Sequence, residues 1–273
     1  MTRFYVMFTI LVFFMMSFLI HGCNPSLGGE NNLAVEVNEP PANFENYNNI
    51  CHSSSNESVR HAAAVEMAKT AKSFDDWDQV GICANWGGDL ENTVAHKMFG
   101  LAVISDEFIE AYLLASRTND TALANAARLK MFDMADVSGD FHSWFHVTLA
   151  SRYDDEDMFF TSLYQMSDVA VTTDDWTWVF KMSPPSDTDN TYYRPLALEK
   201  LNKLTPSFDN WLDIAIKTYY EDGKNSQKTF QMVLIKMSQT AEDYYDWKWV
   251  YKFAPAGSDL QKLAFRKMAK LAE

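Results

Sequence analysis

LEKLNKLTPSFDNWLDIAIKTYYEDGKN, residues 198–225, has the pattern of one helical hairpin. Leucines at every third position predict a first helix, and Pro206 marks its end because proline lacks the N–H needed to continue it. Ser207 is a good N-cap for a second helix, which buries Trp211 on its apolar face. Gly223 can close that helix in a left-handed conformation. The stretch therefore predicts a helix, a tight turn, a second helix and a loop.

The same unit recurs along the chain. In six places an apolar residue, usually Met, is followed ten residues later by an aromatic residue, usually Trp. The pairs are Met67 and Trp77, Met98 and Phe108, Met134 and Trp144, Met166 and Trp176, Leu201 and Trp211, and Met237 and Trp247. We call the six aromatic residues the clamp aromatics. Because a lone hairpin cannot bury its apolar stripe, they are expected to fill the seams of a stack.

These repeats predict an all-α fold. The clamp aromatics recur at intervals of 31 to 36 residues, and a half-copy around Met268 closes the chain. The hairpin length resembles that of tetratricopeptide and HEAT-like repeats, although the W-x2-L-G-x2-Y pattern of the tetratricopeptide repeat is missing. We expect an α-solenoid of about six helix-turn-helix repeats plus a terminal capping helix, over residues 54–273.

The N-terminus has the pattern of an export signal. Arg3 precedes an uncharged apolar run, and residues 1–22 end at Ile20-His21-Gly22 before Cys23. This junction resembles a bacterial lipobox, although His21 differs from the usual small residue. The resemblance implies cleavage before Cys23 and a lipid on its thiol and amine. A plain signal peptide and an uncleaved anchor are the alternatives.

Residues 23–53 are rich in Asn, Glu, Pro and Gly and lack periodic apolar residues. They are expected to form a flexible tether, with the alternative of a short irregular arm packed on the first hairpin. Helical structure is expected from near Ser54. The lipid would then be the chain's contact with a membrane, and the protein would be exported to the cell envelope, facing the periplasm or the cell surface.

The net charge argues against one class of partner, and the cysteine content bears on a possible disulfide. The formal net charge is −14, and Arg3 is the only charge in the first 22 residues, so the mature chain is expected to be acidic at −15. A surface of that sign argues against a nucleic-acid partner. Cys51 and Cys83 remain as an even pair in an exported protein, and they either form a disulfide or stay as separate thiols.

A second column of residues is the best candidate for a binding site. The residues two positions after each clamp aromatic are Gln79, Glu110, His146, Trp178, Asp213 and Trp249. Two residues along a helix is about 200° around its axis, so these side chains should point away from the clamp. Variety at one position of a repeated unit is typical of a solenoid's binding face. The alternative is that this face packs on another layer of helices.

No pattern indicates a cofactor or a metal. His142 and His146 have the spacing of paired ligands on a helix, but HSWFH lacks the Glu of a zinc protease and no third ligand lies nearby in sequence. Paired acids such as Asp75-Asp76 could serve a glycoside hydrolase, yet they stand where acids cap helices. Phosphate-binding and nucleophile motifs are missing from the sequence.

We therefore expect a non-enzymatic repeat lipoprotein that binds a protein or peptide partner in the cell envelope. Its site is expected at Trp178, Trp249, His146, Asp213 and Glu110, and it should need no cofactor or metal. A glycan hydrolase built on a helical toroid and a purely structural envelope protein are the alternatives. The step from fold to function here is analogy.

Overall fold

The computed structural model describes residues 43–84, 88–185, 192–221 and 224–272. The predicted signal segment, most of the predicted tether and Cys23 lie outside these residues. Within them the chain forms fourteen α-helices and no strand, which confirms the all-α prediction. The helices pack mainly against their neighbours in sequence, as in an α-solenoid.

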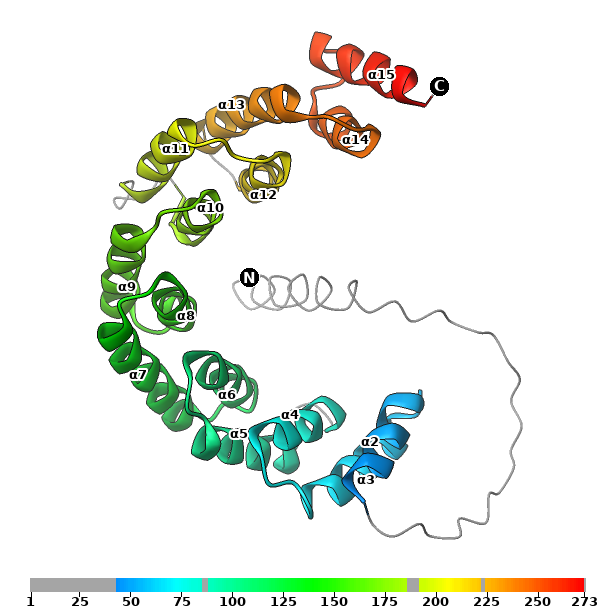
Figure 1. The fold of residues 1–273 in the computed structure, drawn as a ribbon, viewed down its shortest axis with the longest axis vertical. Helices are drawn as coiled ribbons and strands as arrows, with labels where there is room; N and C mark the ends of the chain where they lie inside the picture. The colour runs from blue at the N-terminus through cyan, green and yellow to red at the C-terminus, as the bar shows by residue number, and fades with distance from the viewer. Residues whose placement is uncertain (1–42, 85–87, 186–191, 222–223, 273) are drawn as a thin grey trace, which may run out of the picture. The chain divides into compact units, whose positions relative to one another are not determined.

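Residues 43–272, taken by themselves, form a curved array of two helical layers (Figure 1). The outer layer, on the convex side, consists of α3 (Glu57–Ala68), α5 (Asp89–Leu101), α7 (Thr121–Ser138), α9 (Glu156–Val169), α11 (Tyr193–Lys203), α13 (Lys224–Thr240) and α15 (Asp259–Leu271). The inner layer, on the concave side, consists of α4 (Phe74–Cys83), α6 (Ser105–Arg117), α8 (Phe141–Ser151), α10 (Thr173–Met182), α12 (Phe208–Tyr219) and α14 (Tyr244–Phe253). Each outer helix and the inner helix that follows it make one hairpin.

Capping interactions start the inner helices. In α12 the Ser207 hydroxyl accepts a hydrogen bond from the Asn210 N–H, and the Asn210 side-chain oxygen accepts one from the Ser207 N–H. Such reciprocal capping boxes satisfy two backbone donors that a helix start leaves free. The same arrangement starts three other inner helices, through Ser73 with Asp76, Thr172 with Asp175, and Asp243 with Asp246. In the acidic pairs Asp75-Asp76 and Asp174-Asp175, the second acid therefore caps a helix.

The clamp aromatics form the core that the repeats predict. All six are buried, and Trp211 is only 1% exposed. Their apolar partners are also fully buried, with one exception. Met134 is only partly buried, and Met131, one helical turn earlier on α7, takes the fully buried position instead. The ten-residue spacing identifies the repeat correctly but misplaces this one residue.

Helix α2 (Phe44–Ser53) corrects the expected boundary between tether and body. These residues fall inside the predicted tether, yet they form a helix that is capped by Asn43 and packs on α3 and α4. A disulfide between Cys51 and Cys83, with Cα atoms 6.0 Å apart, ties α2 to α4. Covalent attachment and burial of Cys51 hold a segment whose own apolar pattern is weak. Helix α3 then starts after Asn56 rather than at Ser54.

Three ion pairs, each between a buried side chain and a more exposed one, close a hairpin by linking its outer helix to the end of its inner helix or to the residues just after it. Glu91 lies 2.7 Å from Arg117, and Arg194 donates to Glu221 over 2.7 Å. The two pairs have equivalent places in their hairpins, but the outer helix carries the acid in the first pair and the base in the second. A third pair, Arg128 with the carboxylate of the residue that caps α9, is longer at 3.6 Å.

Candidate functional site

The inner-layer helices turn two different faces to their surroundings. The clamp aromatics lie in the seams with the outer helices. Three have a lysine of the next outer helix by the ring: Lys97 by Trp77, Lys200 by Trp176 and Lys267 by Trp247, with Nζ at 5.5 to 6.0 Å from the ring centre. Phe108 and Trp144 contact Phe99 and Phe132 of their own outer helices. Positions two residues before and two after a clamp aromatic lie roughly opposite on the helix. They therefore line the concave side, which we call the inner face.

The inner face is acidic over its first helices. Asp75 and Asp78 on α4 lie near Glu110 on α6. Withdrawal from water raises the pKa of Glu110 to about 7, and repulsion from Asp78, Asp106 and other carboxylates adds to the effect. Burial, together with repulsion from Asp75, also raises the pKa of Asp78. Several carboxylates thus crowd one stretch of surface.

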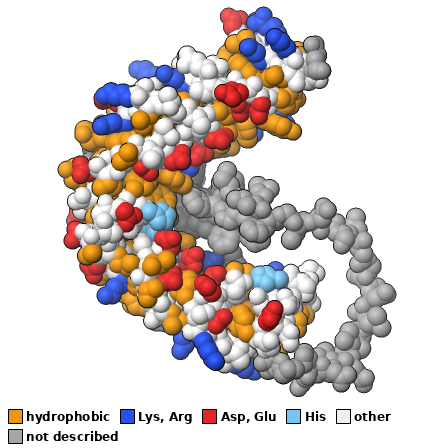
Figure 2. All heavy atoms as spheres, in the orientation of Figure 1, with side chains coloured by type: hydrophobic (Ala, Val, Ile, Leu, Met, Phe, Trp, Pro, Cys, Tyr) orange, Lys and Arg blue, Asp and Glu red, His pale blue; other side chains and the backbone are white. Residues whose placement is uncertain are grey.

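Two histidines and an aspartate meet in the middle of the inner face. His142 and His146 lie one turn apart on α8, with ring centres 4.3 Å apart. The Asp106 carboxylate of α6 lies 3.1 Å from Nε2 of His142 and 3.6 Å from Nδ1 of His146. The Ser105 hydroxyl is 3.0 Å from the same Nδ1. In Figure 2 the histidine surface adjoins acidic side chains over α6 and α8.

The two histidines differ in exposure. The His142 side chain is 64% exposed, whereas that of His146 is 7% exposed. Burial lowers the pKa of His146 to about 4, and the adjacent His142 contributes in the same direction. His146 is therefore neutral at pH 7 and can act as a hydrogen-bond partner or as a ligand.

Beyond α8 the inner face adds aromatic rings and a lysine to its acidic residues. Phe145 contacts Trp178 of α10 with ring centres 4.8 Å apart. Lys181 Nζ lies 3.9 Å from the centre of the Trp178 ring and 2.8 Å from the Asp213 carboxylate of α12. A continuous series of side-chain contacts therefore joins α8, α10 and α12.

Trp249 lies apart from this series. Its ring stacks on Phe253 at 5.6 Å within α14, and Lys252 Nζ lies 4.6 Å from the ring centre. Both Trp178 and Trp249 are partly buried and pack at the edge of the core. They are neither fully exposed nor part of a second helical layer.

The structure thus distributes the five predicted binding residues over several environments. Glu110 is exposed, His146 is buried, and Trp178, Asp213 and Trp249 are intermediate. Lys181 brings Trp178 and Asp213 together, while Trp249 remains separate. Sequence reasoning missed Asp106 and Lys181. Asp106 stands two residues before the clamp aromatic Phe108, as His142 does before Trp144, so comparing that column across repeats would have found it.

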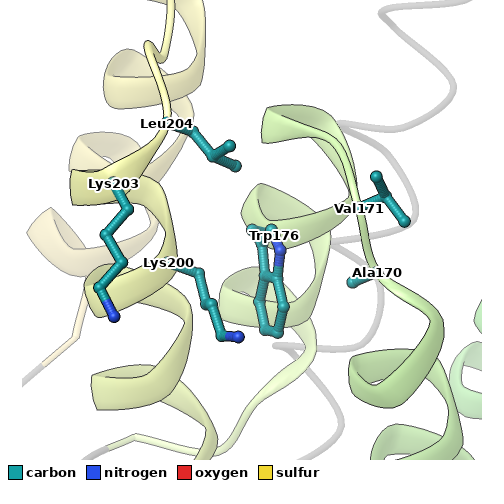
Figure 3. Close-up of a pocket in the computed structure, with 6 residues that line it drawn as sticks. All are labelled: Ala170, Val171, Trp176, Lys200, Lys203 and Leu204. Atoms are coloured by element: carbon teal, nitrogen blue, oxygen red, sulfur yellow. The ribbon is translucent and has the colours of Figure 1, made fainter.

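A cavity of about 290 Å³ lies outside the inner face (Figure 3). It sits between α11 and the turn that joins α9 to α10. Its lining consists of Ala170, Val171, Trp176, Lys200, Lys203 and Leu204. Lys203 is already paired with Glu199, and the Trp176 ring fills one wall. The cavity is a gap in the seam beside a clamp aromatic and holds no cluster of reactive groups among its lining residues.

No helix in the described part of the chain combines the length and apolar character required to cross a bilayer.

Comparison with known proteins adds no relative: no family model, curated protein or solved structure matches this chain.

Proposed function

We propose that this chain is a non-enzymatic, lipid-tethered protein of the cell envelope that binds a segment of another protein along its inner face. The supporting observation is the contrast between the two faces of the inner helices. The face that packs on the outer layer repeats the same kind of residue, whereas the inner face carries different side chains on each helix. Packing alone does not require that variety, but recognition of a specific partner does.

The charge of the inner face supports a basic partner. Asp75, Asp106 and Glu110 are exposed there, and Asp174 and Asp209 continue the acidic positions on α10 and α12. The Lys181 ammonium is already close to Asp213. We therefore propose an extended peptide segment with Lys or Arg side chains, whose apolar parts contact Phe145 and Trp178. Complementary charge favours both encounter and register in such a complex.

The tether and anchor are the second element of the proposal. Cys23 after the apolar run would carry the lipid, and the residues up to about 42 would separate it from the helical body. Membrane contact then comes from the anchor rather than from the acidic body, which repels anionic headgroups. Labelling with a fatty-acid analogue tests this element: Cys23→Ser should abolish the label, and equal label on both proteins would rule the anchor out.

Peptide binding can be measured directly. The full chain in detergent is titrated against fluorescent peptides of equal length, one rich in lysine and one rich in glutamate, with EDTA present. We expect saturable binding of the basic peptide only, with an affinity that falls as salt increases. The double variant Asp75→Asn/Glu110→Gln should weaken it by about tenfold, corresponding to roughly 1.4 kcal/mol.

The matched control removes the same charge from the convex side. Asp133 and Asp136 are exposed on the outer helix α7, so Asp133→Asn/Asp136→Asn removes two carboxylates without touching the inner face. Both variants are titrated at pH 8.5, where Glu110, with a pKa of about 7, is ionised and the two changes in net charge match. If both variants lose the same affinity for the basic peptide, binding depends on net charge alone, and a site on the inner face is contradicted. Absence of saturable binding to either peptide would contradict the proposed chemistry of the partner.

A glycan hydrolase is the second candidate, and one observation favours it. The pKa of Glu110 is raised to about 7 beside Asp78, which is the behaviour expected of a general acid. The described helices between residues 43 and 272 form an open arc rather than a closed ring, and this favours binding (Figure 1). Release of reducing ends from isolated wall glycan, lost in Glu110→Gln, would establish the hydrolase instead.

A further inference from the structure

The side chains of Asp106, His142 and His146 form a three-ligand set on the inner face. Their ligand atoms, one oxygen and two nitrogens, all lie within 4.8 Å of one another. The oxygen is 3.1 Å from one nitrogen and 3.6 Å from the other. In a tetrahedral zinc site with bonds near 2.0–2.1 Å, ligand atoms are about 3.3 Å apart. The two measured separations lie on either side of that value.

The fold holds these groups in place independently of any ion. His142 and His146 are one turn apart on α8, so both rings project from the same side of the helix. Packing of α6 on α8 brings Asp106, the second residue of α6, to them. The His142 ring also stacks on Phe145, with ring centres 6.4 Å apart, which restricts its rotation. To convert this arrangement into a coordination sphere, the Ser105 hydroxyl, 3.0 Å from His146 Nδ1, must turn away and the three ligand atoms must close around the ion.

We propose that Asp106, His142 and His146 bind one divalent transition-metal ion, Zn²⁺ in the first instance. Two imidazoles and one carboxylate suit Zn²⁺, Co²⁺, Ni²⁺ or Cu²⁺, whereas Ca²⁺ and Mg²⁺ require mostly oxygen ligands. Three protein ligands leave a fourth position open. The side chains of His142 and Asp106 are 64% and 57% exposed, so that position faces solvent on the concave side.

The same chain offers an internal comparison. His96 of the outer helix α5 and Asp120, which caps α7, form a single His–Asp pair with Nε2 and the carboxylate oxygen 2.8 Å apart. A hydrogen-bonded His–Asp pair is common and needs no ion. The inner-face set differs because one carboxylate oxygen lies within 3.6 Å of nitrogens from two imidazoles whose ring centres are 4.3 Å apart. A bound cation would let all three groups share one partner, which hydrogen bonds alone do not achieve.

The test is calorimetric titration of Zn²⁺ into the tag-free full chain in detergent, in a Cys23→Ser background that removes the thiol outside the disulfide. We expect one equivalent to bind with micromolar or tighter affinity. His142→Ala and Asp106→Asn should each weaken binding by about a hundredfold or more, since even outer-shell changes cost 10–100-fold. His96→Ala, the matched control, should bind as the parent does.

A second readout reports the geometry. Co²⁺ in the same protein should give the strong visible absorption of a four-coordinate ion, and His142→Ala should lose it. His142 is exposed, so this variant keeps the fold even if substitution of the buried His146 does not. No binding at micromolar Zn²⁺, or equal loss in His142→Ala and His96→Ala, would overturn the site. Because the peptide titration contains EDTA, failure of one proposal is separable from failure of the other.

Discussion

Two tryptophans on α10, two residues apart, show how differently one helix uses its two sides. Trp176 is 5% exposed and lies in the seam, with Lys200 of the next outer helix 5.5 Å from its ring centre. Trp178 is partly buried and contacts the neighbouring inner helix through Phe145. The first ring is surrounded by the core, whereas the second covers its edge.

Helix α14 repeats the contrast. Trp247 is 5% exposed beside Lys267, and Trp249 is partly buried on Phe253. The packing side has an aromatic ring on every inner helix, while the inner face has a tryptophan on only these two. Residue type alone therefore does not identify a core position. Position in the repeat does, because it decides which layer the side chain meets.

The largest effect is expected on the packing side. Trp176→Ala should lower the free energy of unfolding by roughly 3–5 kcal/mol, as for a large buried ring truncated to alanine. Since hairpins contact mainly their neighbours, hydrogen exchange should accelerate first in α9 to α12. Chemical denaturation gives the total loss. A loss below about 1 kcal/mol would mean that the clamp aromatics do not hold the seams.

The ion pairs that close the hairpins test whether stability depends on which helix carries the acid and which the base. Arg194 is 3% exposed, and Arg194→Met leaves the Glu221 carboxylate with only the longer contact to Lys217, at 3.4 Å. We expect a loss of about 3 kcal/mol for such a broken pair. The reversed pair Arg194→Glu/Glu221→Arg should recover part of it, because Glu91 and Arg117 occupy the equivalent places in the opposite order.

Recovery in the reversed pair will be incomplete for a structural reason. Arg194 also donates to the Ser183 carbonyl over 3.1 Å, and a glutamate cannot replace that bond. Arginine at 221 would also face Lys217, which lies 3.4 Å from Glu221, so the reversal is compared with Arg194→Met in a Lys217→Met background. If the reversed pair is no more stable there, the equivalence of the two hairpins is wrong.

The disulfide is expected to stabilise only the end of the stack that contains the first hairpin. Cys51→Ser/Cys83→Ser should lower the free energy of unfolding by about 2–4 kcal/mol, mainly by freeing the unfolded chain. Because the bond joins α2 to α4, exchange should increase in α2 more than in α12. Uniform acceleration along the whole stack would show instead that the repeats unfold as one unit.

The repeated positions were predictable, and the contacts between repeats were not. A ten-residue spacing from Met67 to Trp77 recurs through the chain, and it reflects the fixed geometry of a hairpin. Asp106 stands 36 residues before His142, so only the stacking of α6 on α8 brings them together. Each stands two residues before the clamp aromatic of its own repeat, and this shared position was the signal in the sequence that could have paired them.

Exposure on the inner face depends on neighbours that the helical angle does not reveal. The 200° rule places Trp178 away from Trp176 correctly, but Phe145 from the previous hairpin covers part of its ring. Helix α2 escaped prediction for a related reason. Its apolar pattern is weak, and it is held by a bond to Cys83, 32 residues later on α4 of the first hairpin.

A partly buried lysine near the Arg194 pair gives a smaller, pH-dependent effect. Withdrawal from water lowers the pKa of Lys217 to about 8, with the nearby arginines acting in the same direction and the Glu221 carboxylate, 3.4 Å away, opposing them. Lys217→Met should therefore stabilise the protein at pH 7 by about 1–3 kcal/mol, because the folded state no longer holds a desolvated ammonium.

The sign of the pH dependence follows from proton binding. Between pH 8 and the ordinary lysine pKa of 10.5, unfolded Lys217 keeps a proton that the folded side chain has lost, so the stability of the parent protein rises with pH. The advantage of Lys217→Met should therefore shrink as pH rises through this range. Denaturation curves at pH 7 and pH 10 measure it, and a constant difference would contradict the lowered pKa.

The smallest change in stability is expected on the inner face, where the change in binding should be largest. Trp178→Ala and Trp249→Ala each remove one ring contact and one lysine contact from a partly buried site. Such contacts contribute about 0.5–1.5 kcal/mol each, well below the loss expected at Trp176.

The double variant separates a binding surface from a packing surface. We expect a modest shift in the melting curve together with a loss of a few kcal/mol in partner capture, the usual result when interface aromatics are truncated. Trp178→Ala alone should account for most of the lost capture, because its ring is joined to Phe145 and Lys181 in the middle of the inner face, whereas Trp249 lies apart on α14. Pull-down from envelope extracts and titration with the basic peptide measure capture. A drop in stability as large as that of Trp176→Ala would make these rings part of the core, and unchanged capture in a stable protein would remove them from the site.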